Sequence, residues 1–278
     1  MRKILNIVKW GSTLGSEPQN FLDAGWIRQV LSRVPESKKR IWALRMLSLS
    51  PHYFLSPDDP AYSGMSNDEY LEATFKECVD SRVNLYDRLL HRYFRETDTV
   101  VDYGCGPGFL ARVLARNVKD VYACDISEGV LACARILNAA PNLKYVAATE
   151  KGLATFPDQS ADVIVSFAMI QHISDEIFDR VLANMHRKLK PGGRLILHIQ
   201  LIDDVWRTED DWRSDNTVAG KIKFRYGLHC FGRTENRHVE MAGAKGFNNI
   251  EISKIDGDWL EAFPEIASQR ILTADKPI

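Results

Sequence analysis

The sequence predicts an α/β fold, in which a doubly wound and mostly parallel sheet carries helices on both faces and follows a partly helical N-terminal cap. Three observations carry this prediction. Strand-like and helix-like segments alternate from residue 99 onward, a glycine-rich turn follows the first predicted strand, and the stretch before that strand differs in charge and aromatic content. We therefore divide the chain into a cap, residues 1–97, and an α/β domain, residues 98–278.

The composition of the whole chain favours a folded protein without a general affinity for polyanions. The 278 residues are 45% hydrophobic and 26% charged, with a formal net charge of −1, so we expect no nucleic-acid partner. The five cysteines form no CxxC pair, and an odd number argues against a complete disulfide framework. Neither a leader-like segment nor a membrane-spanning apolar run is indicated, and we expect a cytoplasmic location.

Charge is uneven along the predicted cap. Nine Lys or Arg against three Asp or Glu give a net charge of +6 through Ser50, whereas residues 51–98 carry a net charge of −5. The basic part also holds many apolar residues, which leaves two interpretations. It could make a weak contact with an anionic membrane surface, or its apolar residues could pack on the core with the charges solvated, which we favour.

The remaining elements follow from hydrophobic periodicity. Residues 67–94 predict a helix, because apolar residues such as Leu71, Phe75 and Val79 recur near the 3.6-residue period. The predicted strands are residues 99–103, 121–124, 143–147, 161–167, 194–199, 249–255 and 270–274, the final one antiparallel. The predicted helices are residues 109–117, 129–138, 176–189 and 235–245, with a Pro-Gly-Gly turn at residues 191–193.

The strongest chemical signal is the stretch TVVDYGCGPG at residues 99–108, an apolar strand that ends in an acidic residue and a glycine-rich turn. Glycines let the backbone approach a ligand closely, and ligands of open parallel sheets lie beyond the carboxyl ends of the strands. A dinucleotide fingerprint would need glycine where Phe109 stands, and no GxxxxGK[ST] loop is present. The ligand should therefore be a nucleoside without a phosphate chain.

Asp125 closes the second predicted strand, 21 residues after Gly104. A carboxylate at this place can accept hydrogen bonds from both hydroxyls of a ribose. An aspartate that ends a strand often caps the next helix instead, but its register with the glycine turn favours the ribose role.

With these motifs the chain resembles the class I S-adenosylmethionine-dependent methyltransferases, in the small-molecule branch often called type 11. The resemblance covers about residues 98–278 and is carried by DYGCGPG at 102–108, Asp125, FPDQSAD at 156–162 and LKPGGR at 189–194. It implies a Rossmann-like fold, S-adenosylmethionine as cofactor and transfer of its methyl group. The cofactor-binding residues that it implies are Asp102, Tyr103, Gly104, Cys105, Gly106, Gly108, Asp125, Ile126, Glu150, Lys151, Phe167 and Ala168.

Within that resemblance, Gly104 and Gly106 pass under the methionine part of the cofactor, Asp125 holds the ribose, and the segment after the third strand frames the adenine. This chain departs from the family there, because Glu150, followed by Lys151, stands where an Asp is usual.

Two histidines are candidates for proton chemistry, and a third is expected to be structural. An oxygen acceptor usually needs a base, and an imidazole with a pKa of about 6.5 suits that role. His172 follows the fourth predicted strand and His229 lies in the insertion after the fifth, so we name both as catalytic candidates, with a structural role as the alternative for each. His198 lies within an apolar strand and is expected to be a hydrogen-bonded core residue.

We expect no metal site. Asp203 and Asp204 follow the fifth strand and could supply oxygen ligands, but no matching carboxylate follows the fourth strand.

The expected acceptor is a small molecule, methylated on a hydroxyl oxygen of a metabolite, sugar or glycolipid. The alternatives are a cofactor-binding module without catalysis, and methylation of nitrogen, carbon or RNA. Another enzyme on the same scaffold is a further alternative. The aromatic residues that could line the acceptor pocket are Tyr53, Phe54, Tyr62, Phe75, Tyr226 and Phe231.

Overall fold

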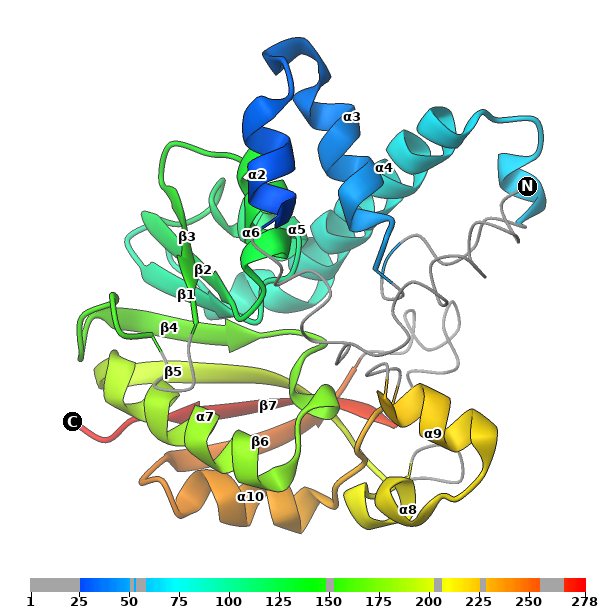
Figure 1. The fold of residues 1–278 in the computed structure, drawn as a ribbon. Coiled ribbons are helices and arrows are strands. Elements are labelled where there is room, and N and C mark those ends of the chain that lie inside the picture. Colours follow the sequence, from blue (N-terminus) through cyan, green and yellow to red (C-terminus); the bar gives the residue numbers. More distant parts are fainter. Residues whose placement is uncertain are drawn as a thin grey trace.

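The computed structural model describes residues 26–50, 53, 59–148, 153–202, 207–225, 229–255 and 268–278. In these residues, seven strands form one sheet in the order β3-β2-β1-β4-β5-β7-β6 (Figure 1). The strands are β1 (Thr99–Tyr103), β2 (Asp120–Asp125), β3 (Leu143–Ala147), β4 (Ala161–Ser166), β5 (Leu189–Gln200), β6 (Asn248–Lys254) and β7 (Gln269–Asp275).

Helices cover both faces of this sheet. The α-helices are α2 (Trp26–Arg33), α3 (Glu36–Leu47), α4 (Asn67–Leu85), α5 (Phe109–Leu114), α6 (Glu128–Leu137), α7 (Asp175–Lys188), α8 (Glu209–Ser214), α9 (Val218–Arg225) and α10 (Glu235–Gly243). Figure 1 shows α4, α5 and α6 on one face and α7 and α10 on the other, with α2 and α3 outside the first layer. None of the helices in the described ranges is both long enough and apolar enough to cross a membrane.

The strand directions confirm the predicted doubly wound sheet. β1 pairs in parallel with β2 and β4, and β3 and β5 extend the parallel set. β7 lies between β5 and β6 and is antiparallel to both. The predicted elements are all present, with ends that differ by a few residues. The predicted helix at residues 67–94 is α-helical to Leu85 and then continues as a π turn, η3 (Tyr86–Leu90), and a 3-10 turn, η4 (His91–Tyr93).

The turn predicted at residues 191–193 is wrong as a boundary between elements, because it lies inside β5. Gly192 has a φ of +74°, and the register between β4 and β5 shifts next to it. Its amide donates to the carbonyl of Lys276, and the amide of Lys276 donates to the carbonyl of Gly193, at 2.9 Å each. The glycine pair therefore makes a bulge whose backbone groups bond the C-terminal segment instead of ending the strand.

Most of the described part of the cap packs its apolar residues inward. Ile27, Leu31 and Leu44 are buried in a cluster that α2 and α3 share with α6. At the surface, Arg40 pairs with Glu72 at 2.7 Å and joins α3 to α4. For these residues the packing interpretation holds, whereas contact of the basic N-terminal segment with a membrane stays a prediction, since its first 25 residues lie outside the described ranges.

The helix α4 and the turn after it share a core with the sheet. Leu85, Leu89 and Leu90 are buried with Val100 and Leu114 in one hydrophobic cluster. The division of the chain after residue 97 stays a prediction about sequence regions, because this core lies on both sides of it.

Candidate functional site

The glycine-rich turn lies at the carboxyl end of β1 and is held by the neighbouring strand. The amides of Gly104 and Cys105 both donate to the carbonyl of Cys124 in β2, at 2.8 and 2.9 Å. Gly104, Gly106 and Gly108 have φ values of +77°, +52° and +79°, which residues with a Cβ rarely adopt. The turn is thus a fixed backbone surface that opens α5.

Asp125 supports this turn from the end of β2. Its Oδ2 accepts from the amide of Gly106 and its Oδ1 from the amide of Ser127, both at 2.9 Å. A carboxylate has about four acceptor positions, so the backbone amides do not use all of them and a ligand hydroxyl can also donate to this group. Burial raises the pKa of Asp125, and hydrogen bonds from the backbone amides of Ser127, Gly106 and Ile126 oppose that rise. The geometry suits the predicted ribose contact and adds a second task, the support of Gly106.

The glycines also make room for side chains of the protein. A Cβ on Gly106 would lie 2.9 Å from the hydroxyl oxygen of Tyr53, and one on Gly104 would lie 2.8 Å from Cβ of Met169. Such distances are too short for real atoms. Tyr53 from the cap and Met169 from the segment after β4 therefore both lie against the turn.

Asp102 is a buried carboxylate that lacks a full set of partners. It is 2% exposed, and its Oδ2 has no hydrogen-bond partner among the residues that the structure describes. Burial and the charge of Asp125 raise its pKa to about 7, against the opposing charge of Arg82. An ammonium group placed beside it would satisfy the free oxygen and ionise the acid, so the residue fits the methionine end of S-adenosylmethionine.

Arg82 also lies at this candidate site, and it was not among the residues predicted from the sequence. It lies on the last turn of α4, where its charge acts on Asp102 and Tyr53 and its guanidinium lies 5.4 Å from the ring of Phe167. A cation here can pair with the carboxylate of an amino-acid ligand. The only signal in the sequence was a basic residue in a predicted helix, which usually lies in solvent.

The other predicted cofactor residues lie in several environments. The Tyr103 side chain belongs to the core beneath α7, and its carbonyl accepts from Ser166 Oγ of β4 at 2.8 Å. Cys105 is buried, and Ile126, 56% exposed, follows Asp125 and offers an apolar surface. Glu150 and Lys151 lie outside the described residues.

Phe167 and Ala168 form a turn after β4 that is stabilised by His198. Ala168 has a φ of +57°, and its amide donates to His198 Nδ1 at 3.2 Å. The opposite nitrogen of His198 donates to Gln269 Oε1 at 2.8 Å. The imidazole also stacks on Phe167 with ring centres 4.2 Å apart, and burial lowers its pKa to about 4. The prediction of a hydrogen-bonded core histidine is confirmed.

His172 ends the short 3-10 turn η5 (Ile170–His172), three residues after Met169. Its Nδ1 lies 2.8 Å from the carbonyl oxygen of His229. Because a carbonyl can only accept, Nδ1 carries the hydrogen and Nε2 carries a lone pair. Burial lowers the pKa of the half-buried ring, although the bond to His229 opposes this. The imidazole is therefore neutral near pH 7 and has the tautomer of a base.

The structure brings His229 to His172 through its backbone, while its side chain lies in an aromatic cluster. The residue is 6% exposed, and its ring stacks on Phe224 with ring centres 4.8 Å apart and lies 4.5 Å from the ring centre of Phe231. Burial and the neighbouring His172 lower its pKa to about 4. A catalytic role for the His229 side chain stays a prediction, whereas its carbonyl orients His172.

The aromatic residues predicted to line the acceptor pocket lie in different places. Tyr62 and Phe75 are buried in the cap, Phe75 against Phe109 at 5.3 Å, so they are core residues. Phe231 belongs to the cluster around His229, and Tyr53 lies at Gly106. Phe54, Tyr226, Asp203 and Asp204 lie outside the described residues.

Comparison with known proteins agrees with this geometry. Residues 101–197 match the family described as "Methyltransferase domain". A Ubiquinone biosynthesis O-methyltransferase from Pseudomonas paraeruginosa is 33% identical over 131 residues, which cover 45% of this chain and 54% of that protein. The chain thus spans about half the length of this relative.

Two solved structures share the fold. An S-adenosylmethionine dependent methyltransferase from Mesorhizobium loti aligns with a TM-score of 0.53 at 21% identity, over 71% of this chain and all of the other. Phosphoethanolamine N-methyltransferase 2 from Haemonchus contortus, in complex with S-adenosylmethionine, aligns with a TM-score of 0.52 at 18% identity, over 72% of this chain and 53% of the other. The family match and the geometry of the glycine turn identify residues 101–197 as a class I S-adenosylmethionine-dependent methyltransferase domain of the type 11-like branch.

Proposed function

We propose that this protein transfers the methyl group of S-adenosylmethionine to a hydroxyl oxygen of a small-molecule acceptor. The observation that carries the proposal is His172, a half-buried and neutral imidazole whose Nδ1 hydrogen is committed to the His229 carbonyl. Met169, in the same segment, packs on Gly104 of the cofactor turn. A base in the required tautomer is thus held beside the cofactor turn.

Residues at different positions of the site would bind the cofactor and remove the proton of the acceptor. Asp102 and Arg82 would hold the ammonium and carboxylate of the methionine part, and Asp125 would accept from the ribose hydroxyls. The bound cofactor supplies an electrophilic methyl group. His172 Nε2 would take the proton of the acceptor hydroxyl as the oxygen–carbon bond forms and the carbon–sulfur bond breaks, and would then release that proton to water.

The N-terminal cap would cover the cofactor and contribute to the acceptor pocket. Tyr53 supports this, because its hydroxyl lies at Gly106 and burial raises its pKa well above the ordinary value, so it stays protonated and can donate. The name of the Pseudomonas relative, an O-methyltransferase, also supports an oxygen acceptor. Methylation of nitrogen is the second candidate, favoured by the name of the Haemonchus structure.

The proposal is tested in two steps with the purified 278-residue chain. Calorimetric titration should detect binding of S-adenosylmethionine and none of NAD. Incubation of cell-extract fractions with methyl-labelled cofactor should then yield a labelled small molecule whose fragmentation shows an oxygen-linked methyl group. A nitrogen-linked methyl group would show that the acceptor atom is nitrogen and would contradict the proposed oxygen acceptor. Binding without a labelled product in any fraction would instead favour a module without catalysis.

A further inference from the structure

The short segment 229–233, which we call the strap, runs beside the η5 turn that carries His172. The amide of Phe231 donates to the carbonyl of Gln171 at 2.7 Å, and His172 Nδ1 donates to the carbonyl of His229 at 2.8 Å. The backbone of Arg233 pairs with Gln200 and Ile202 at the end of β5. The strap is therefore anchored to the sheet on one side and to η5 on the other.

Arg233 makes the most specific of these contacts. Its side chain is 4% exposed. Nη2 donates to the carbonyl of Ile173 at 2.6 Å, and Nη1 donates to the carbonyl of Ile170 at 3.3 Å. These two residues flank His172 on either side. One guanidinium thus holds both ends of the turn that carries the base.

Asp175, at the start of α7, keeps this guanidinium in place. Its Oδ1 accepts from Nε of Arg233 at 2.6 Å, and the guanidinium also lies 5.1 Å from the ring of Phe178. Asp175 therefore neutralises the buried charge of Arg233, and the planar fork of arginine can serve the carboxylate and both carbonyls together.

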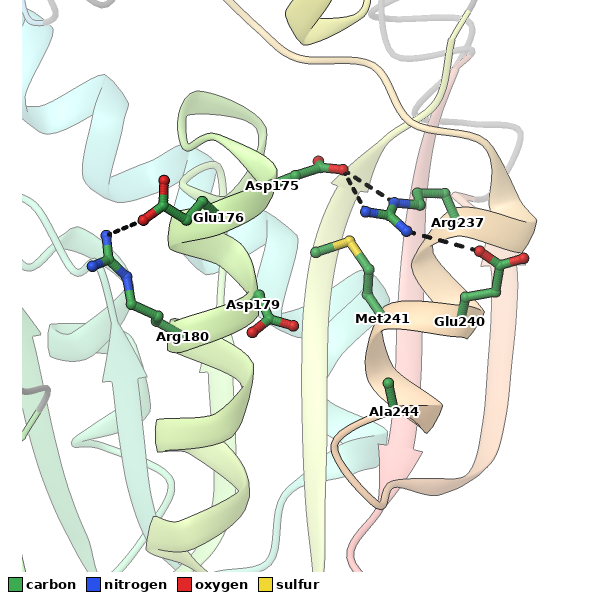
Figure 2. A pocket seen from close by; sticks show the side chains of 8 residues that line it. All are labelled: Asp175, Glu176, Asp179, Arg180, Arg237, Glu240, Met241 and Ala244. Carbon is green, nitrogen blue, oxygen red and sulfur yellow. Dashed lines mark hydrogen bonds and ion pairs between the residues drawn. The ribbon is translucent and has the colours of Figure 1, made fainter.

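A second arginine shares Asp175 but faces outward. Figure 2 shows Arg237 of α10 directed at Asp175 across the groove between α7 and α10. It donates to Oδ2 at 2.9 and 3.0 Å and lies 3.9 Å from Glu240. Its side chain is 48% exposed, and its bonds go to carboxylates of α7 and α10. Arg237 is thus a matched partner of Asp175 without a bond to η5 among the described contacts.

We propose that Arg233 is a positioning residue for His172, which acts through the carbonyls of Ile170 and Ile173 to hold the imidazole against the His229 carbonyl. The value of this arrangement for turnover rests on the proposed function, whereas the arrangement itself does not. Small displacements of a catalytic group can cost about 10²-fold in rate. Loss of Arg233 should therefore lower turnover while leaving the affinity for S-adenosylmethionine unchanged.

The experiment compares Arg233→Met with Arg237→Met by NMR of protein labelled with ¹⁵N in its histidines. His172 signals are assigned from His172→Gln. In the wild-type protein and in Arg237→Met, His172 should appear as a single tautomer with the hydrogen on Nδ1. In Arg233→Met its ring signals should show a mixture of tautomers, and Arg233→Lys should lie between, because one ammonium cannot hold both carbonyls.

Calorimetry with S-adenosylmethionine shows that each variant is folded. A folded Arg233→Met protein with an unchanged His172 tautomer would overturn the proposal. If that variant does not fold, Arg233→Lys decides, and a wild-type tautomer there also overturns it. The rate at which the labelled product forms distinguishes the positioning role of Arg233 from the proposed role of His172 as a base. If His172→Ala keeps full activity, the role of His172 as a base fails, while the effect of Arg233 on the tautomer stands.

Discussion

The two edges of the site are assembled in different ways. At the ends of β1 and β2, the contact between Gly106 and Asp125 joins residues 19 positions apart. At the end of β4, the contacts of η5 join residues 57 to 63 positions apart, from His172–His229 to Ile170–Arg233. The cofactor edge is thus a local strand-turn-helix-strand unit. The base edge instead requires residues 229–233, which follow β5, to pack against the η5 turn that follows β4.

The electrostatics of the two edges differ as well. At the cofactor edge, burial and the charge of Asp125 raise the pKa of Asp102 to about 7, so a cation beside it would stabilise its ionised form. At the base edge, burial lowers the pKa of His172 and keeps the ring neutral. We therefore expect changes at the cofactor edge to alter affinity and changes at the base edge to alter rate.

The largest expected effect is on rate. His172→Ala should reduce methyl transfer to the identified acceptor by about 10²- to 10⁴-fold, because proton removal by a placed base contributes that much, and the affinity for S-adenosylmethionine should stay within about twofold. Single-turnover rates with labelled cofactor measure the first quantity and calorimetry the second. His91→Ala, on an exposed turn, is the control. Equal rates in His172→Ala and His91→Ala would show that His172 is not the base and has a structural role.

The next effect is on affinity. Asp125→Ala should weaken binding of S-adenosylmethionine by about 10²-fold or more, since hydrogen bonds to a charged group contribute roughly 1.5–3 kcal/mol each. The variant also loses the support of the Gly106 amide. Asp120→Ala, at the opposite end of the same strand, should bind normally. Calorimetric affinities that do not differ between these two variants would remove Asp125 from the cofactor site.

A smaller effect on affinity tests the residue that the sequence did not reveal. Arg82→Met should weaken cofactor binding by about 10-fold, the loss expected for one charge-assisted bond to the methionine carboxylate. Arg88→Met, on the exposed side of the following turn, is the control. S-adenosylmethioninamide, which lacks that carboxylate, should bind both variants and the wild type equally. A further loss of affinity for this analogue in Arg82→Met would mean that Arg82 does not act by pairing with the methionine carboxylate.

The smallest effect is a change in protonation. Asp102 has a pKa of about 7 without ligand, and an ammonium group beside it stabilises the carboxylate and lowers that pKa. Binding should therefore release roughly half a proton at pH 7 and nearly one at pH 6. Calorimetry in Tris and in phosphate buffers measures this release. Asp102→Asn should release fewer protons than the wild type at both pH values, and equal release would place the ammonium elsewhere.

The fold and the position of the glycine turn were largely predictable for a physical reason. Alternating apolar strands and amphipathic helices specify a parallel sheet, and three glycines after Asp102 can be interpreted without knowing any distant contact. The error at residues 191–193 arose because Pro-Gly-Gly usually ends an element, whereas pairing with the C-terminal segment keeps it within β5. Arg82 was missed because a helical arginine gives no signal of which side chains it will face.

By itself, the sequence determined the class of fold, the glycine turn and the position of Asp125, because each depends on residues that are near one another along the chain. Only the tertiary structure decided that His172 carries its hydrogen on Nδ1, that the backbone of His229 faces it, and that Arg233 is buried between the carbonyls that flank it. These contacts depend on how the segment after β5 packs against the segment after β4. No local pattern of residues encodes the direction in which two distant segments meet.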